Sequence, residues 1–171
     1  IYNNAIRVMT DDMVVNHNIL VIPGIRESLI TDFAANRVAS YGKALFVMDI
    51  PHYTSGSSND RIFVSSNGLA SGRPDAEATA SLFDIRQLNN SYVATYFPDV
   101  YVADSGDDAE AAVASRRSIR VPSSVVALGA LAKNDSILSP WFAPAGFNRG
   151  ALNSISATDV RLNTEDRDTL Y

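Results

Sequence analysis

The sequence predicts an α/β domain with a mostly parallel sheet flanked by helices. Short apolar runs rich in β-branched residues alternate along the chain with longer segments whose apolar residues recur every three to four positions. The first such unit, at residues 18–51, has the order strand, helix, strand. A unit of this kind pairs its two strands in parallel through a right-handed crossover. We therefore expect one domain covering residues 1–171.

The composition supports a globular domain and argues against several partners. Of the 171 residues, 46% are hydrophobic and 19% are charged, which is enough apolar material for a core. The net charge of −5 and the lack of a Lys- or Arg-rich run argue against a nucleic-acid surface. With no cysteine, disulfides and thiolate metal sites are excluded. No apolar run reaches the length of a membrane span, so we expect no direct membrane insertion.

The first half of the chain contains two strands and two helices in this interpretation. Residues 18–24, NILVIPG, form a buried strand that ends at Pro-Gly, and residues 26–42 form an amphipathic helix with Gly42 at its C-terminal end. Residues 43–51, KALFVMDIP, form the second strand. The polar stretch 52–73 is expected to cross the surface, with a short strand at 61–68, before a helix that opens at Pro74.

The second half is predicted from aromatic and capping signals. Residues 91–104 form an aromatic strand broken or bent at Pro98. Residues 103–118 form a surface loop or insertion, in which the charged, alanine-rich stretch 105–117 is either a loop or a brief helix. Pro122 opens a helix with Ser123 and Ser124 as its cap. Residues 155–162 form a strand, and Asn163 or Thr164 caps a last helix at 163–171. The inward face of the helix after Pro122 is predicted to carry Val125, Leu128, Leu131 and Ala132.

The sequence offers weak support for catalysis, cofactors or metals. The glycines of residues 68–74 lack the Lys-Ser/Thr pair of a phosphate loop, and His17 and His52 do not lie in helical register with carboxylates. Asp49 and His52 follow a strand, where α/β enzymes place active sites, but no serine lies in a G-x-S-x-G elbow. We expect no enzyme activity, cofactor or metal; a hydrolase and a glycan-binding adhesin using exposed aromatics remain alternatives.

Residues 139–152, SPWFAPAGFNRGAL, are interpreted as a structural loop. Its prolines stiffen an extended path, its glycines permit unusual backbone angles, and its aromatic side chains are expected to anchor the path to the sheet edge. Arg149 is expected to bond backbone carbonyls or a carboxylate of the same domain. The residues assigned to this structural loop are Trp141, Phe142, Pro144, Gly146, Asn148, Arg149 and Gly150.

Six segments, in order, resemble the contractile phage tail sheath family. They are NILVIPGI, ALFVMDIP, NNSYVATYFPDVYV, RVPSSVVALGALAKND, PWFAPAGFNRGAL and RLNTEDRDTLY. The resemblance spans nearly the whole chain, and its last three segments together are its most specific part. It implies a subtilisin-like sheath domain without a catalytic triad. Because members of the family continue past the last segment, the chain is interpreted as a fragment that lacks the C-terminal domain.

The family resemblance also implies a function and partners. A sheath subunit polymerises into stacked six-fold rings around a tail tube and contracts to drive the tube through the host envelope during genome ejection. The implied partners are further copies of the chain, the tail tube protein, and the baseplate and tail terminator proteins. The implied location is the virion tail, assembled in the host cytoplasm. A sheath of a related device, bacteriocin or type VI-like, remains an alternative.

Contacts between subunits are predicted from charge. Basic residues near the end of the 103–118 loop are expected to meet acids of a neighbouring subunit as the lattice forms and rearranges. Pairing within one loop, or solvation of the same groups, remains the alternative. The candidate inter-subunit residues are Arg116, Arg117, Arg120, Asp104, Asp107, Asp108 and Glu110.

Overall fold

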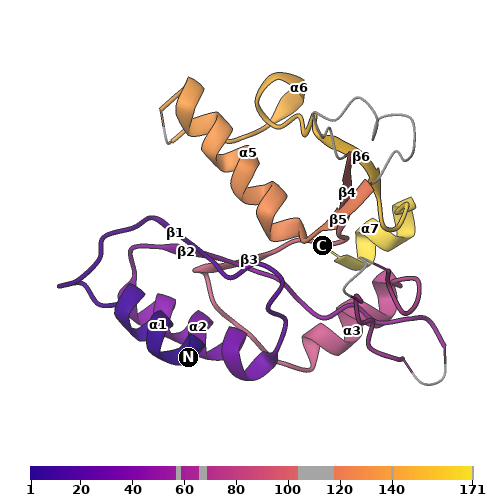
Figure 1. The fold of residues 1–171 in the computed structure, drawn as a ribbon, viewed down its shortest axis with the longest axis horizontal. Coiled ribbons are helices and arrows are strands. Elements are labelled where there is room, and N and C mark those ends of the chain that lie inside the picture. The colour runs from indigo at the N-terminus through magenta and orange to yellow at the C-terminus, as the bar shows by residue number, and fades with distance from the viewer. Residues whose placement is uncertain (57–58, 66–68, 104–117, 140, 171) are drawn as a thin grey trace, which may run out of the picture.

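The computed structural model describes residues 1–56, 59–65, 69–103, 118–139 and 141–170 and confirms the α/β class (Figure 1). A parallel sheet has the strand order β1 (Ile19–Val21), β2 (Leu45–Met48) and β3 (Val93–Thr95). Leu20 lies opposite Phe46, and Phe46 lies opposite Val93. The parallel pairing predicted for the first two strands is therefore confirmed, and β2 is the central strand.

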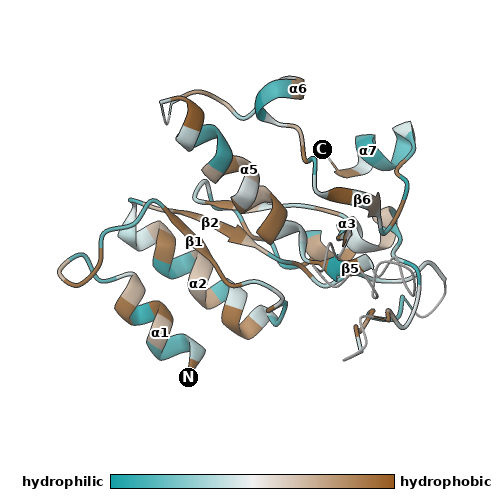
Figure 2. Ribbon diagram, turned by 45° about the horizontal axis from the view of Figure 1, so that its top comes forward, coloured by the Kyte–Doolittle hydropathy of each residue, from teal (hydrophilic) through white to brown (hydrophobic). Residues whose placement is uncertain are grey.

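Helices cover both faces of this sheet. Helices α1 (Tyr2–Met9) and α2 (Ser28–Tyr41) lie on one side and α5 (Ser123–Ile137) on the other, while the apolar strands between them are brown in Figure 2. The core joins α2 to β2, with Ala34, Ala35 and Val38 packed near Phe46 and Met48, all fully or almost fully buried. Helix α1 was not predicted; it adds Ile6 to this core.

Gly42 ends α2 as the sequence predicts. Its φ of 70° is left-handed, a conformation that glycine adopts without a Cβ penalty, and its N–H donates to the carbonyl of Val38 at 2.8 Å. The chain can therefore leave the helix and enter β2 three residues later.

The later strands form a separate antiparallel sheet rather than an extension of the parallel one. Its order is β5 (Ser118–Val121), β4 (Val100–Ala103) and β6 (Ile155–Thr158). The predicted parallel sheet flanked by helices is present as β1, β2 and β3, and this second, smaller sheet is an addition that the sequence did not reveal. Only residues 96–99, including Pro98, separate β3 from β4. A parallel return requires a crossover of a dozen or more residues, so β4 cannot pair in parallel with β3.

Capping side chains begin two other helices. In α3 (Ala76–Asp84), which follows Pro74 as predicted, the Asp75 carboxylate accepts from the Ala78 N–H at 3.0 Å. Ahead of α7 (Thr164–Leu170), the Asn163 side-chain oxygen accepts from the Asp166 N–H at 2.7 Å, which confirms the predicted cap. Helices α3 and α7 pack against each other.

Two shorter segments differ from their predictions. The described part of residues 61–68 forms isolated bridges, such as Val64 with Ala70, instead of a strand. A short helix, α6 (Gly146–Arg149), lies inside the predicted structural loop. Within the described ranges, none of the helices combines the length and the apolarity needed to cross a bilayer.

Candidate functional site

The candidate site lies at the carboxyl edge of the parallel sheet and is centred on Asp49. This buried residue directly follows β2. Its Oδ2 accepts from the Gly24 N–H and from the Ser124 hydroxyl, both at 2.8 Å, and its Oδ1 accepts from the Ser124 N–H at 3.2 Å. One carboxylate thus ties the turn after β1 and the end of β2 to the first turn of α5.

The sequence predicts Ser123 and Ser124 as the cap of their own helix. In the structure their hydroxyls instead bond residues outside α5. The Ser123 hydroxyl donates to the carbonyl oxygen of Tyr96 at 2.7 Å, and the Ser124 hydroxyl donates to Asp49. The predicted inward face of α5 was also wrong in part, because Val125 and Ala132 are exposed. Ser123 and Ser124 are buried because Asp49 holds the first turn of the helix, and Asn134, in its last turns, is buried where it bonds Phe142.

A second carboxylate, Asp99, gathers two cations and a histidine. Arg26 donates to both of its oxygens, at 2.9 and 2.6 Å, and an Arg120 nitrogen lies 3.2 Å from Oδ2. The His52 Nε2 lies 3.9 Å from Oδ1, and its ring meets the Phe97 ring edge-on, with centroids 4.8 Å apart. All of these charges are buried or nearly so, so each depends on its partners to offset the loss of water.

The charge cluster continues into the antiparallel sheet through Arg120. Arg120 lies in β5 with a side chain 2% exposed, and its Nη2 bonds the carboxylate of Asp159, which also accepts from the Tyr101 hydroxyl at 3.2 Å. Burial and the Asp159 carboxylate raise the pKa of Tyr101. Among the described residues, the Arg120 Nε and Nη1 groups are buried without a hydrogen-bond partner. The cluster therefore links both sheets through ion pairs.

The pKa of His52 is lowered to about 4, so the ring is neutral near pH 7. Burial is the main cause; Asp99 opposes it, and the charges of Arg26 and Arg120 add to it. A histidine that serves a serine nucleophile must accept the proton of that hydroxyl. Here the Ser124 hydroxyl points to Asp49, while His52 faces Asp99. The geometry brings the predicted Asp49 and His52 to one sheet edge without assembling them into a relay.

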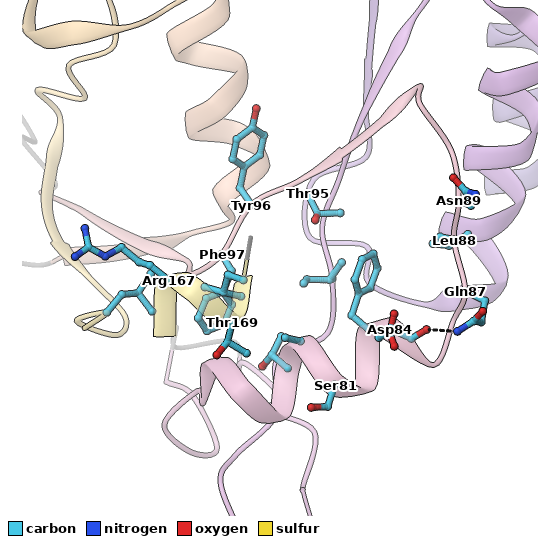
Figure 3. A pocket seen from close by; sticks show the side chains of 16 residues that line it. Ser81, Asp84, Gln87, Leu88, Asn89, Thr95, Tyr96, Phe97, Arg167 and Thr169 are labelled. Atoms are coloured by element: carbon cyan, nitrogen blue, oxygen red, sulfur yellow. Dashed lines mark hydrogen bonds between the residues drawn. The ribbon is translucent and has the colours of Figure 1, made fainter. Parts of the chain in front are cut away.

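A cavity of about 770 Å³ opens where α3 and α7 meet the chain after β3, and sequence reasoning missed it (Figure 3). It is lined by side chains of α3, the segment after α3, the end of β3 and α7, including Ser81, Gln87, Tyr96 and Thr169. Its lining mixes aromatic, hydroxyl and amide groups and holds Asp84 and Arg167 as its charged members. Four segments far apart in the sequence form it, at residues 50, 79–89, 95–97 and 162–170, so no local pattern could have predicted it.

The structural loop at residues 139–152 lies open to solvent instead of being anchored at a sheet edge. Trp141 is 81% exposed and Phe147 is 96% exposed, so the expected anchoring role is wrong for both side chains. A hydrogen bond ties the loop to α5, where the buried Asn134 side chain donates to the carbonyl oxygen of Phe142 at 2.6 Å. Arg149, expected to bond a carbonyl or carboxylate, lies over the Phe142 ring at 5.8 Å.

The two glycines of the loop have different structural roles. Gly146 has a left-handed φ of 76°, and Gly150 leaves no room for a Cβ, which would come within 2.8 Å of the Pro144 carbonyl oxygen. The predicted unusual backbone angle is confirmed for Gly146, whereas Gly150 has an ordinary φ of −99° and needs glycine for lack of space. Asn148 lies in α6 and is exposed.

The predicted subunit contacts fall mostly outside the described residues. That group comprises Asp104, Asp107, Asp108, Glu110, Arg116 and Arg117, whose role stays a prediction. Arg120 is described, and it pairs with Asp99 and Asp159 of its own chain rather than presenting its charge to a neighbour. No group of three or more potential metal ligands occurs among the residues that the structure describes.

Comparison with known proteins gives one partial similarity. A stretch of 43 residues is 42% identical to the tail sheath protein of Vibrio phage KVP40 (isolate Vibrio parahaemolyticus/Japan/Matsuzaki/1991). The match covers 25% of this chain and 6% of the relative, so the aligned stretch is a small part of that protein's length. No family model matches the chain. The chain is therefore similar, over part of its length, to a phage tail sheath protein.

Proposed function

We propose that this chain is part of a structural subunit of a contractile phage tail sheath. The observation that carries the proposal is the 43-residue similarity to a tail sheath protein. In the proposed role, subunits polymerise in stacked rings around a tail tube and contract to drive the tube through the host envelope. The proposed partners are further copies of the chain, the tube protein, and the baseplate and terminator proteins, within a virion tail assembled in the host cytoplasm.

The contacts at the candidate site support a mechanical role. A sheath subunit must move as a nearly rigid body while its outer contacts change. Asp49 and Asp99 each connect segments far apart in the sequence, and the Arg120 pairs extend this network into the second sheet. Such buried and mutually paired groups resist independent movement of the two sheets. A non-enzymatic role is part of the proposal, since the Ser124 hydroxyl is engaged by a carboxylate.

Electron microscopy of the full-length protein tests the proposal. After purification at high protein concentration, negative-stain images are expected to show hollow tubes with a regular axial repeat. Dilution or a mild denaturant then shifts the material toward single chains, as measured by light scattering. A protein that stays at single-chain mass under all conditions, including the presence of a co-purified tube protein, contradicts the sheath role.

A further inference from the structure

Two exposed apolar surfaces lie at different ends of the molecule. The first is the N-terminal loop, residues 10–18 between α1 and β1, where Met13 is 93% exposed and Val14 is 61% exposed. The second, here called the α6 surface, consists of Trp141, Phe147 and the neighbouring Arg149. In Figures 1 and 2 the N-terminal loop and α6 lie on opposite sides of the parallel sheet.

Both surfaces have the composition of a protein interface. Removing large apolar side chains from water is favourable. Aromatic residues, Met and Arg are enriched where protein surfaces meet. At the α6 surface the Arg149 guanidinium covers the ring of Phe142, and a guanidinium stacked in this way can still offer its N–H edge to a carboxylate.

The charges of the two surfaces are complementary. Asp11 and Asp12 immediately precede Met13, and both are exposed. Asp12 lies 3.2 Å from Lys43, and Asp11 accepts from the Met13 N–H at 3.0 Å, which fixes the start of the loop. Beyond the Asp12–Lys43 pair, the N-terminal loop therefore offers the carboxylate of Asp11, and the α6 surface offers the single opposite charge of Arg149.

We propose that the α6 surface of one copy binds the N-terminal loop of a second copy. Two different surfaces that bind each other form a head-to-tail contact, which leaves one free surface of each kind on every pair and so builds rings or helical filaments. A symmetric contact between two α6 surfaces would instead stop at a dimer. The proposal rests on the sheath function and deepens it, because it names one contact through which copies would join.

Thiol cross-linking in the full-length protein tests the direction of the contact. The 171 residues contain no cysteine, and the unsubstituted full-length protein treated with the same reagent reports any thiol elsewhere in the protein. The variants are Met13→Cys, Phe147→Cys and the two combined, each treated with a flexible bismaleimide. Because both side chains are almost fully exposed, none of the three is expected to change the melting temperature. Met13→Cys combined with Glu77→Cys, an exposed position on α3, is the matched control.

The head-to-tail contact predicts a distinctive pattern on a denaturing gel. The Met13→Cys/Phe147→Cys variant gives a ladder of covalent multimers, each single variant stays at single-chain mass, and an equimolar mixture of the two single variants stops at the dimer. The control pair gives no ladder. Adding Arg149→Glu to the double-cysteine variant lowers the yield of multimers several-fold.

Other outcomes overturn the contact and separate it from the sheath proposal. Covalent dimers of Phe147→Cys alone mean a symmetric contact between α6 surfaces. A protein that forms tubes by electron microscopy but gives no ladder retains the sheath function and refutes this contact. A ladder without tubes supports the contact and refutes the sheath function, and the absence of both refutes both.

Discussion

Asp49 concentrates three hydrogen bonds on one buried carboxylate, and its replacement is expected to be costly. Asp49→Ala leaves the N–H groups of Gly24 and Ser124 and the Ser124 hydroxyl without their acceptor. Because a buried donor without a partner costs about 1–3 kcal/mol, we expect the free energy of unfolding to fall by about 4 kcal/mol. The change in the free energy of unfolding is measured by urea denaturation, with circular dichroism as the signal.

Ser124→Ala is the matched control for that change, because it removes one donor and keeps the carboxylate bonded to the two N–H groups. Its expected cost is about 1 kcal/mol. Equal losses for the two variants would mean that Asp49 does not act as a shared acceptor.

Protonation of His52 is expected to make the stability of the fold depend on pH. The pKa of the histidine is lowered to about 4 in the folded chain, against an ordinary value of 6.5, so the unfolded chain binds the proton more readily. The contribution of neutral His52 to the free energy of unfolding is fully present above pH 6.5 and is lost as the pH falls toward 4. Between these values, the free energy of unfolding is expected to decrease by roughly 1.4 kcal/mol per pH unit at most.

Urea denaturation of the parent and of His52→Gln across this range isolates the histidine. The neutral amide cannot be protonated, so the difference in slope between the two proteins reports His52 alone. We expect the variant to show the shallower decline. The same slope in both would contradict a buried neutral histidine beside Arg26 and Arg120.

At the scale of elements, the sequence predicts best where the signal is local. The unit from β1 through α2 to β2 follows from apolar periodicity, Pro23-Gly24 and the left-handed Gly42, all read within a few residues. The helix caps at Asp75 and Asn163 are local in the same way. Strand direction is not local, which is why sequence reasoning assigned no direction to β4, β5 and β6 and did not reveal their antiparallel sheet.

Exposure of the 139–152 loop could not be predicted because aromatic composition does not say which molecule covers a side chain. Trp141 and Phe147 have the residue types of a core, and a single sequence does not distinguish burial within a chain from burial between chains. Asn134 also escaped notice. An amide in the last turns of a helix gives no sign that it will bond the carbonyl of Phe142 eight residues later.

At the scale of the whole molecule, the charge cluster joins elements that sequence reasoning treated separately. Arg26 follows β1, Asp99 precedes β4, Arg120 lies in β5 and Asp159 follows β6. Asp99 and Arg26 are 73 positions apart, so their pairing depends on the completed fold. The sequence did predict Asp49 and His52 at a strand end, but not the partners that make them structural.

Arg120 is expected to be the most sensitive member of this cluster. Arg120→Ala leaves the buried Asp159 without its cation, whereas Asp99 keeps Arg26. Removing one partner of a buried ion pair costs about 3–5 kcal/mol, so the free energy of unfolding should fall by that amount.

The control is Arg61→Ala, which breaks an exposed pair with Glu27 and should cost less than about 1 kcal/mol. Hydrogen exchange locates the effect: amides of β4 and β5 should lose protection before those of β2, because Arg120 anchors the antiparallel sheet to Asp99. A loss confined to β2, or a cost equal to that of Arg61→Ala, would show that the two sheets are held together by other contacts.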